Sequence, residues 1–191
     1  MTDTGKVNDL LAQIPRADKG LPPVHLWNPA FCGDIDMRIA RDGTWYYLGT
    51  PIGRKPMVKL FSSILRRDGD DYFLITPVEK VGIQVEDAPF VAVALDVLGD
   101  GQAQVLRFTS NVDEVFDAGH EHPLRVFTDA QTQEPSPYVN ARGNLDALIH
   151  RNVFYQLVAL AETRSVDGEA WLGVWSHGVF FPLGRDPQHS G

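Results

Sequence analysis

Apolar residues recur at helical spacing near the start of the chain. Val7, Leu10, Leu11 and Ile14 occupy positions i, i+3, i+4 and i+7, which lie on one face of a helix. Pro15 follows directly, and proline disrupts a helix interior because it lacks the backbone N–H. The pattern therefore predicts a short amphipathic helix that ends at this proline.

A period of two begins further along the chain. Between residues 35 and 39 every second residue is apolar, which is typical of a strand with one buried face. Asp42 and Gly43 then favour a tight turn, and the aromatic run 45–48 follows. We expect these two segments to form a hairpin.

A second helix is expected to begin near Pro56, because proline is tolerated in the first turn of a helix. Its predicted apolar stripe consists of Met57, Leu60, Phe61, Ile64 and Leu65. Strands are predicted to follow at 72–76, 81–85 and 90–97. The last of these is nearly all apolar, which predicts that both of its faces are covered.

The second half of the chain repeats this mixture of strands and one helix. Strands are predicted at 103–109, 124–128 and 138–142, and a helix is predicted from residue 145 to residue 162. The aromatic segments 171–175 and 179–181 predict a closing hairpin.

The two halves also echo each other in sequence. A helix, an Asp-Gly turn and an aromatic strand occur at 52–75 and again at 149–174, with isoleucine, arginine and leucine in register. Because strands outnumber helices without alternating with them, we expect an α+β fold of two tandem, weakly similar motifs, each with a helix packed on a small antiparallel sheet. The predicted parts are an N-terminal helix and linker (1–21), a first repeat (22–88), a second repeat (89–185) and a frayed tail (186–191).

Composition restricts the partners of the protein. The chain carries 17 Lys+Arg against 25 Asp+Glu, a net charge of −8, which opposes binding to nucleic acid. The start of the chain has no apolar signal segment, and no apolar run approaches the ~18 residues that a membrane span requires, so we expect a cytoplasmic protein without membrane contact. Cys32 is the single cysteine, which excludes an internal disulfide and a thiolate zinc site.

The clearest candidate binding feature is a pair of cations at the predicted start of the helix near Pro56. Arg54 and Lys55 follow a glycine there, and the free N–H groups of a helix N-terminus attract anions. Arg142 and Asn144 form a weaker parallel before the predicted second-half helix. The alternative is that Arg54 and Lys55 are solvated or pair with nearby carboxylates.

Asp34 and Asp36 are candidates of a different kind. Their spacing places both carboxylates on one face of a strand, where they could transfer protons or hold a divalent cation. The alternative is a solvated strand face on which Arg38 pairs with them. The segment 120–122, His-Glu-His, has no third ligand at a recognisable spacing, so we predict no metal site. We also predict no cofactor, and we assign no catalytic residue.

Six segments of the chain form a pattern found in a known family: 32–39, 42–45, 51–55, 60–61, 76–81 and 85–90. Through these segments the chain resembles an uncharacterised bacterial family, domain of unknown function 1285. The resemblance covers about residues 22–185, densely in the first half and diffusely in the second. It implies an α+β protein with a repeated structural motif and a role in signalling or small-molecule sensing, and it transfers no catalytic residue.

Our leading hypothesis is a cytoplasmic ligand-binding or regulatory protein with a cleft between the two repeats. A small anionic molecule would bind near Arg54, Lys55 and Lys80. One alternative is a hydrolase or transferase that uses Asp34 and Asp36. Another is an interaction module that docks a protein partner, or a second copy of the chain, through a sheet edge or the N-terminal helix.

Overall fold

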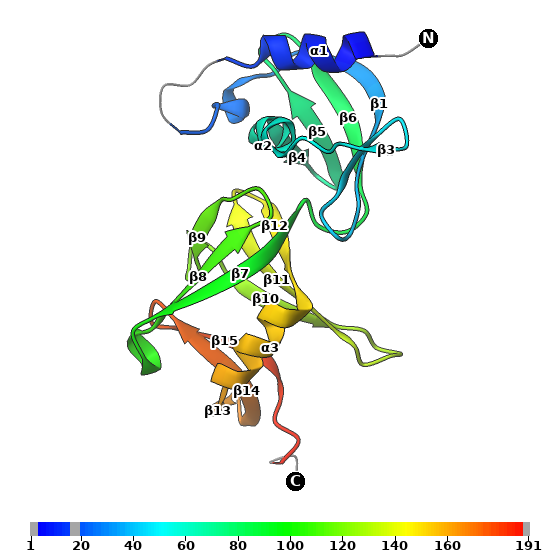
Figure 1. The fold of residues 1–191 in the computed structure, drawn as a ribbon. Coiled ribbons are helices and arrows are strands. Elements are labelled where there is room, and N and C mark those ends of the chain that lie inside the picture. The colour runs from blue at the N-terminus through cyan, green and yellow to red at the C-terminus, as the bar shows by residue number, and fades with distance from the viewer. Residues whose placement is uncertain (1–3, 16–19, 189–191) are drawn as a thin grey trace. The chain divides into compact units, whose positions relative to one another are not determined.

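The computed structural model describes residues 4–15 and 20–188 (Figure 1). The chain divides into two compact units, Met1–Asp87 and Ala88–Gly191, which are described separately below as unit 1 and unit 2. Among the described residues, no helix is long and apolar enough to cross a membrane.

Unit 1 is built on one six-stranded sheet with the strand order β3-β2-β1-β6-β5-β4. Its central pair, β1 and β6, is parallel, and the other neighbours are antiparallel. The strands are β1 (Phe31–Ile39), β2 (Trp45–Tyr47), β3 (Thr50–Pro51), β4 (Leu65–Asp68), β5 (Asp71–Ile75) and β6 (Lys80–Val85). The helices are α1 (Thr4–Gln13), the short 3-10 helix η1 (Val24–Leu26) and α2 (Lys55–Ser63).

The elements predicted for unit 1 are largely present. Helix α1 and the hairpin of β1 and β2 are confirmed, and Phe61 of α2 stacks on Trp45 with ring centroids 6.3 Å apart. The apolar stripe of α2 was predicted too long, because the helix ends at Ser63 and Leu65 already belongs to β4. Leu60, also predicted to be buried, is 40% exposed.

Unit 2 contains two sheets. The larger has the order β10-β11-β12-β7-β8-β9, with β12 and β7 parallel, and the smaller is the antiparallel sheet β13-β14-β15. The strands of the larger sheet are β7 (Phe90–Leu98), β8 (Val105–Ser110), β9 (Val115–Asp117), β10 (Leu124–Thr128), β11 (Pro135–Arg142) and β12 (Leu145–Ile149). The remaining elements are η2 (Gly101–Ala103), α3 (Arg151–Leu160), β13 (Glu162–Val166), β14 (Glu169–Ser176) and β15 (Val179–Arg185).

The helix predicted from 145 to 162 is wrong at both ends. Residues 145–149 form β12, in which buried and partly exposed residues alternate, and residue 162 begins β13. His150 separates strand from helix, because its backbone is extended and its Nδ1 accepts a hydrogen bond from the N–H of Asn152 at 3.2 Å. Apolar residues at 145, 148, 149, 153 and 157 keep helical spacing across this boundary, which hid the change of period.

Strand β7 was predicted to be covered on both faces, and this is also wrong. Phe90, Val91 and Ala92 are buried, whereas the rest of the strand is partly or fully exposed, with Val97 at 42%. The first three residues pair with β12 on one side, whereas the second half of the strand pairs with β8 alone.

The two segments predicted to repeat each other contain the same elements in the same order. A helix, a strand, an Asp-Gly turn and a second strand occur as α2-β4-β5 in unit 1 and as α3-β13-β14 in unit 2. Their surroundings differ, because β4 and β5 belong to the six-stranded sheet whereas β13 and β14 form part of a separate one. The architecture is therefore two tandem, mostly β units, and the six-stranded sheets are mixed rather than antiparallel.

The predicted frayed tail begins at an anchored residue. Asp186 is 5% exposed, accepts a hydrogen bond from the hydroxyl of Thr163 at 2.6 Å, and donates its N–H to the carbonyl of Ala170 at 3.0 Å. Residues 189–191 of the predicted tail lie outside the described residues.

Candidate functional site

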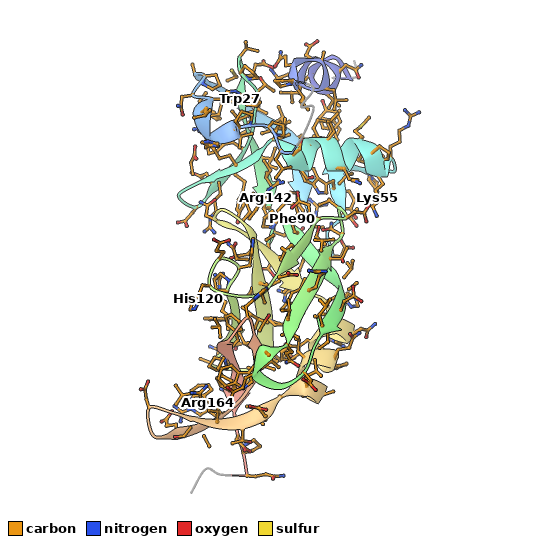
Figure 2. All side chains as sticks on the ribbon, turned by 90° about the vertical axis from the view of Figure 1, so that its left-hand side faces the viewer. Trp27, Lys55, Phe90, His120, Arg142 and Arg164 are labelled. Carbon is orange, nitrogen blue, oxygen red and sulfur yellow. The ribbon has the colours of Figure 1, made fainter. Side chains whose placement is uncertain are left out.

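A surface pocket of about 520 Å³ lies in unit 2, and we call it the histidine pocket. Four segments that are separate in sequence line it: Arg107 of β8, residues 115–117 of β9, the loop 119–122 and the turn at His177. Three of the lining side chains are imidazoles, those of His120, His122 and His177. Figure 2 labels His120 at the edge of unit 2.

Buried polar groups hold these segments together. The hydroxyl of Ser176, which is fully buried, donates to the carbonyl of Ala118 at 2.6 Å and accepts from the N–H of Leu106 at 2.9 Å. The N–H of His177 donates to the carbonyl of Gln104 at 3.1 Å. The hairpin that carries His177 is therefore fastened to β8 and to the loop that follows β9.

His177 occupies an unusual backbone conformation. It forms a two-residue turn with Gly178 between the paired residues Ser176 and Val179, and its φ is 49°. Asparagine and glycine are the usual residues in such a turn, because a positive φ strains other side chains. A Cβ on Gly119 would lie 3.4 Å from the Cβ of His177, an ordinary van der Waals distance, so the turn packs closely against the loop 119–122. Strain of this kind is concentrated at functional sites.

The pocket has one fixed ion pair. Arg107 donates to both carboxylate oxygens of Asp117, from Nε to Oδ1 at 2.8 Å and from Nη2 to Oδ2 at 3.1 Å. These hydrogen bonds hold the pKa of Asp117 below its ordinary value, and the same pair raises the pKa of Arg107. Nε2 of His177 lies 3.7 Å from Oδ2 of Asp117, so a protonated imidazole there faces an ionised carboxylate.

His122 is oriented by its neighbours. Its Nδ1 lies 3.1 Å from the carbonyl oxygen of Asn140, and its ring is 5.7 Å from that of Phe116. A carbonyl can only accept, so Nδ1 carries the proton and Nε2 remains for another partner. Among residues 4–15 and 20–188, no three His, Cys, Asp or Glu side chains are arranged to hold a metal ion.

The candidate carboxylates of unit 1 lie on an open surface. Asp34 and Asp36 are exposed on β1, and Asp34 lies over Gly82, where an added Cβ would come within 2.0 Å of its Oδ1. Arg38 does not pair with Asp34 or Asp36, as the alternative interpretation expected. Its Nη1 binds Oε1 of Glu86 at 2.5 Å, and its guanidinium lies 4.3 Å from the ring centre of Tyr46.

The candidate cations of unit 1 are distributed between two environments. Arg54 is the N-cap of α2 and Lys55 is its first residue, and both are exposed. Figure 2 labels Lys55 at this end of the helix. Lys80 instead binds Oδ2 of Asp68 at 2.9 Å and lies 4.2 Å from the ring centre of Phe73. Arg66 holds the other side of Asp68, and its hydrogen bonds lower the pKa of that carboxyl.

Arg142 and Asn144 do not precede a helix as predicted. They flank Gly143 in the connection between β11 and β12, where Asn144 is exposed. Arg142 is mostly buried, pairs with Glu114, and lies 5.2 Å from the ring centre of Phe90 (Figure 2). Burial raises the pKa of Glu114 and lowers the pKa of Arg142, each against the attraction of its partner.

Sequence reasoning therefore missed the residues that line the histidine pocket. His120 and His122 were considered only as metal ligands, and Arg107 and Asp117 were not considered. Their signal is weak in sequence, because these two residues become partners only through the pairing of β8 with β9.

Two family models match the chain. The first, "Domain of unknown function (DUF1285), N-terminal domain", matches residues 22–88, and the second, "Protein of unknown function (DUF1285), C-terminal domain", matches residues 89–183. No curated protein matches the chain.

Two solved structures of DUF1285 family proteins are similar. The protein from Silicibacter pomeroyi DSS-3 is 53% identical, with a TM-score of 0.86 over 95% of this chain and 96% of that one. The protein from Shewanella baltica OS155 is 31% identical, with a TM-score of 0.52 over 64% of this chain and 90% of that one.

Proposed function

Since this chain belongs to the DUF1285 family, whose descriptions name no activity, we propose its function from its own geometry: it binds a small anionic molecule in the histidine pocket of unit 2 and acts as a regulatory or sensing protein. The observation that carries the proposal is the meeting of three imidazoles and a guanidinium in one pocket.

The lining contains one guanidinium and three imidazoles against two carboxylates, those of Asp117 and Glu121, and this balance favours an anion when the imidazoles are protonated. Imidazolium and guanidinium groups donate charge-assisted hydrogen bonds to phosphate and carboxylate oxygens. Asp117 engages one edge of the Arg107 guanidinium and leaves further N–H groups for a ligand. The pocket, about 520 Å³, also lies within the usual volume range of small-molecule sites.

A binding role is better supported than the hydrolase or transferase alternative. Asp34 and Asp36 are both exposed, and neither belongs to the histidine pocket. We further propose that the protein is cytoplasmic and acts in signalling. Its net charge of −8 disfavours nucleic acid as a partner. The cleft between the two units stays a prediction.

Calorimetric titration with inorganic phosphate and with phenyl phosphate tests the proposal. Replacing His177 with asparagine removes the imidazole but keeps a residue that tolerates positive φ. The loss of one charge-assisted hydrogen bond should weaken binding about tenfold.

The matched control is His25→Asn, which makes the same change at an exposed histidine of unit 1. It should leave binding unchanged. Equal affinities of the His177 variant and the wild-type protein would contradict the proposal, as would an absence of heat with both anions.

A further inference from the structure

Strand β13 is the outermost strand of the smaller sheet in unit 2, and among the described residues it pairs with β14 alone. Residues 162–165 are all exposed, and the pairing with β14 contains no bulge. Proteins usually protect an exposed strand edge with proline, a bulge or a covering segment. β13 contains no proline, so it presents a regular row of backbone groups for pairing with another chain.

The turn that joins β13 to β14 sets the direction of these backbone groups. Asp167 and Gly168 form a two-residue turn with positive φ values of 52° and 81°. Val166 and Glu169 face each other across it. In such a hairpin the residues that flank the turn are a hydrogen-bonded pair, and such pairs alternate along the strands with pairs that are not hydrogen-bonded. Every second residue before Val166, including Arg164, therefore directs its N–H and C=O groups toward β14.

A hydrogen bond on the other side of β14 gives the same register. The carbonyl of Ala170 accepts the N–H of Asp186, which follows β15, at 3.0 Å. The backbone groups of Ala170 thus point toward β15 and do not bond Ser165, the opposite residue of β13. By the same alternation, Thr163 and Ser165 direct their N–H and C=O groups to the free edge of β13.

Two opposite charges lie on one face of β13, because Glu162 and Arg164 are two residues apart. The indole N–H of Trp175 donates to Oε1 of Glu162 at 2.6 Å, and the guanidinium of Arg164 lies 4.6 Å from the centre of the same indole ring. Figure 2 labels Arg164. In the part of the chain that the structure describes, neither charge has an ion-pair partner. Both are held in place and remain available to a partner.

The charge pattern of β13 is complementary to itself. When two identical strands pair about a two-fold axis, residues that point to the free edge must face one another. With Thr163 opposite Thr163 of the second copy, Glu162 faces Arg164 of the second copy, and Arg164 faces Glu162 of the second copy. Both charge pairs occupy positions that are not hydrogen-bonded, where cross-strand side chains are closest and opposite charges are favourable.

The neighbouring two-fold registers are less favourable. An axis at Arg164 places the two guanidinium groups opposite each other, and like charges in that position are destabilising. An axis at Ser165 places Arg164 opposite Val166 and forms no charge pair. The charge pattern therefore favours the register centred on Thr163, with a second copy of the chain as the occupant of this edge.

We propose that two copies of the chain associate through β13, so that their smaller sheets join into one continuous antiparallel sheet. Backbone hydrogen bonds at Thr163 and Ser165 supply affinity, and the two pairs of Glu162 with Arg164 set the register. Since the interface is one short strand from each copy, we expect a weak dimer, half formed on the order of 100 μM. The proposal is independent of anion binding in the histidine pocket.

Sedimentation equilibrium of the full chain and of two charge-reversal variants tests the proposal. Arg164→Glu and Glu162→Arg each place like charges opposite one another, so each should weaken association at least about tenfold. An equal mixture of these two variants restores both opposite-charge pairs in a mixed dimer and should associate about as strongly as the wild-type protein. The matched control is Arg151→Glu, which makes the same change in charge at an exposed residue of α3 and should leave association unchanged.

Amide hydrogen exchange of the unmodified protein tests the same edge without a substitution. Pairing covers the N–H groups of Thr163 and Ser165, so at a dissociation constant of about 100 μM they should exchange about fourfold more slowly at about 1 mM than at about 10 μM protein. The N–H of Arg164 already faces β14 and should be protected at both concentrations.

A wild-type protein that stays monomeric up to about 1 mM would overturn the proposal. So would charge-reversal variants that associate as the wild-type protein does, or folded variants whose mixture does not restore association. Where a variant does not fold, hydrogen exchange decides the question. Association that leaves the amides of Thr163 and Ser165 unprotected would assign the dimer to another surface and overturn the proposal.

Discussion

The two units present their charged residues in different ways. In unit 1 the residues with sequence cues for binding lie on the surface, with Arg54 and Lys55 exposed at one end of α2. In unit 2 charges converge from distant segments, as in the pair of Arg107 with Asp117 beside His177 and the mostly buried pair of Arg142 with Glu114.

This difference shows what a local pattern can and cannot reveal. Two cations next to a predicted helix start are visible in the sequence, and so they were chosen as candidates. A pocket made by the pairing of β8 with β9 and by the docking of a hairpin turn leaves no such pattern.

The largest effect is expected at the buried pair of unit 2. Glu114→Ala removes the carboxylate that faces Arg142, whose side chain is only 18% exposed. Breaking a buried ion pair typically destabilises by about 3–5 kcal/mol, and partial exposure places this pair near the lower end. Urea unfolding followed by circular dichroism measures the change in the free energy of unfolding.

The control for this variant replaces both partners with apolar residues. Glu114→Leu combined with Arg142→Met removes the charges together, and most of the stability should return because no buried charge is left alone. If the single and double variants were equally destabilised, the pair would not be the source of the effect.

A smaller effect is expected at the more exposed network of unit 1. Asp68 accepts hydrogen bonds from Arg66 and Lys80, so its pKa in the folded protein is lowered. Its contribution is therefore fully present above the unfolded-state pKa of about 3.9 and is lost as the pH falls through the lower folded value. Asp68→Asn should cost about 1 kcal/mol at neutral pH, since such partly exposed pairs contribute little.

Unfolding experiments over a range of pH distinguish this cause from a packing defect. The difference between Asp68→Asn and the wild-type protein should shrink below about pH 4 and vanish in stronger acid, where both side chains are neutral. A difference that stayed constant with pH would mean that the charge of Asp68 is not responsible.

The smallest effect is expected at the exposed cations of α2. Replacing Arg54 and Lys55 with glutamine should leave the free energy of unfolding within about 0.5 kcal/mol of the wild-type value, as for most surface substitutions. Phosphate affinity, measured by calorimetry, should be unchanged, because neither residue lines the histidine pocket. A loss of phosphate binding in this variant would mean that the anion binds at the N-terminus of α2, as the sequence predicted.

Much of the fold could be predicted because its signals are local. The alternation at 35–39, the Asp-Gly turn at 42–43 and the aromatic hairpin that ends the second half all correspond to observed strands. The boundary at His150 could not be predicted, because apolar residues keep helical spacing through both β12 and α3 and tertiary contacts decide between strand and helix.

The candidate site was less predictable than the fold. Lys80 was a candidate for binding an anionic ligand, and in the structure it pairs with Asp68, a pairing that depends on the register of β4, β5 and β6. His177 lies between the two segments of the predicted closing hairpin, yet its approach to Asp117 depends on the buried hydroxyl of Ser176. Such contacts follow from the three-dimensional arrangement of strands.

The most direct test of the histidine pocket is an NMR titration of the histidine ring signals with inorganic phosphate at about pH 6, where imidazole is partly protonated. The signals of His120, His122 and His177 should move along one saturable curve, while that of His25 in unit 1 should stay in place. Equal movement of all four signals, or saturable shifts only in the amides at Arg54 and Lys55, would contradict the assignment of the anion site to unit 2.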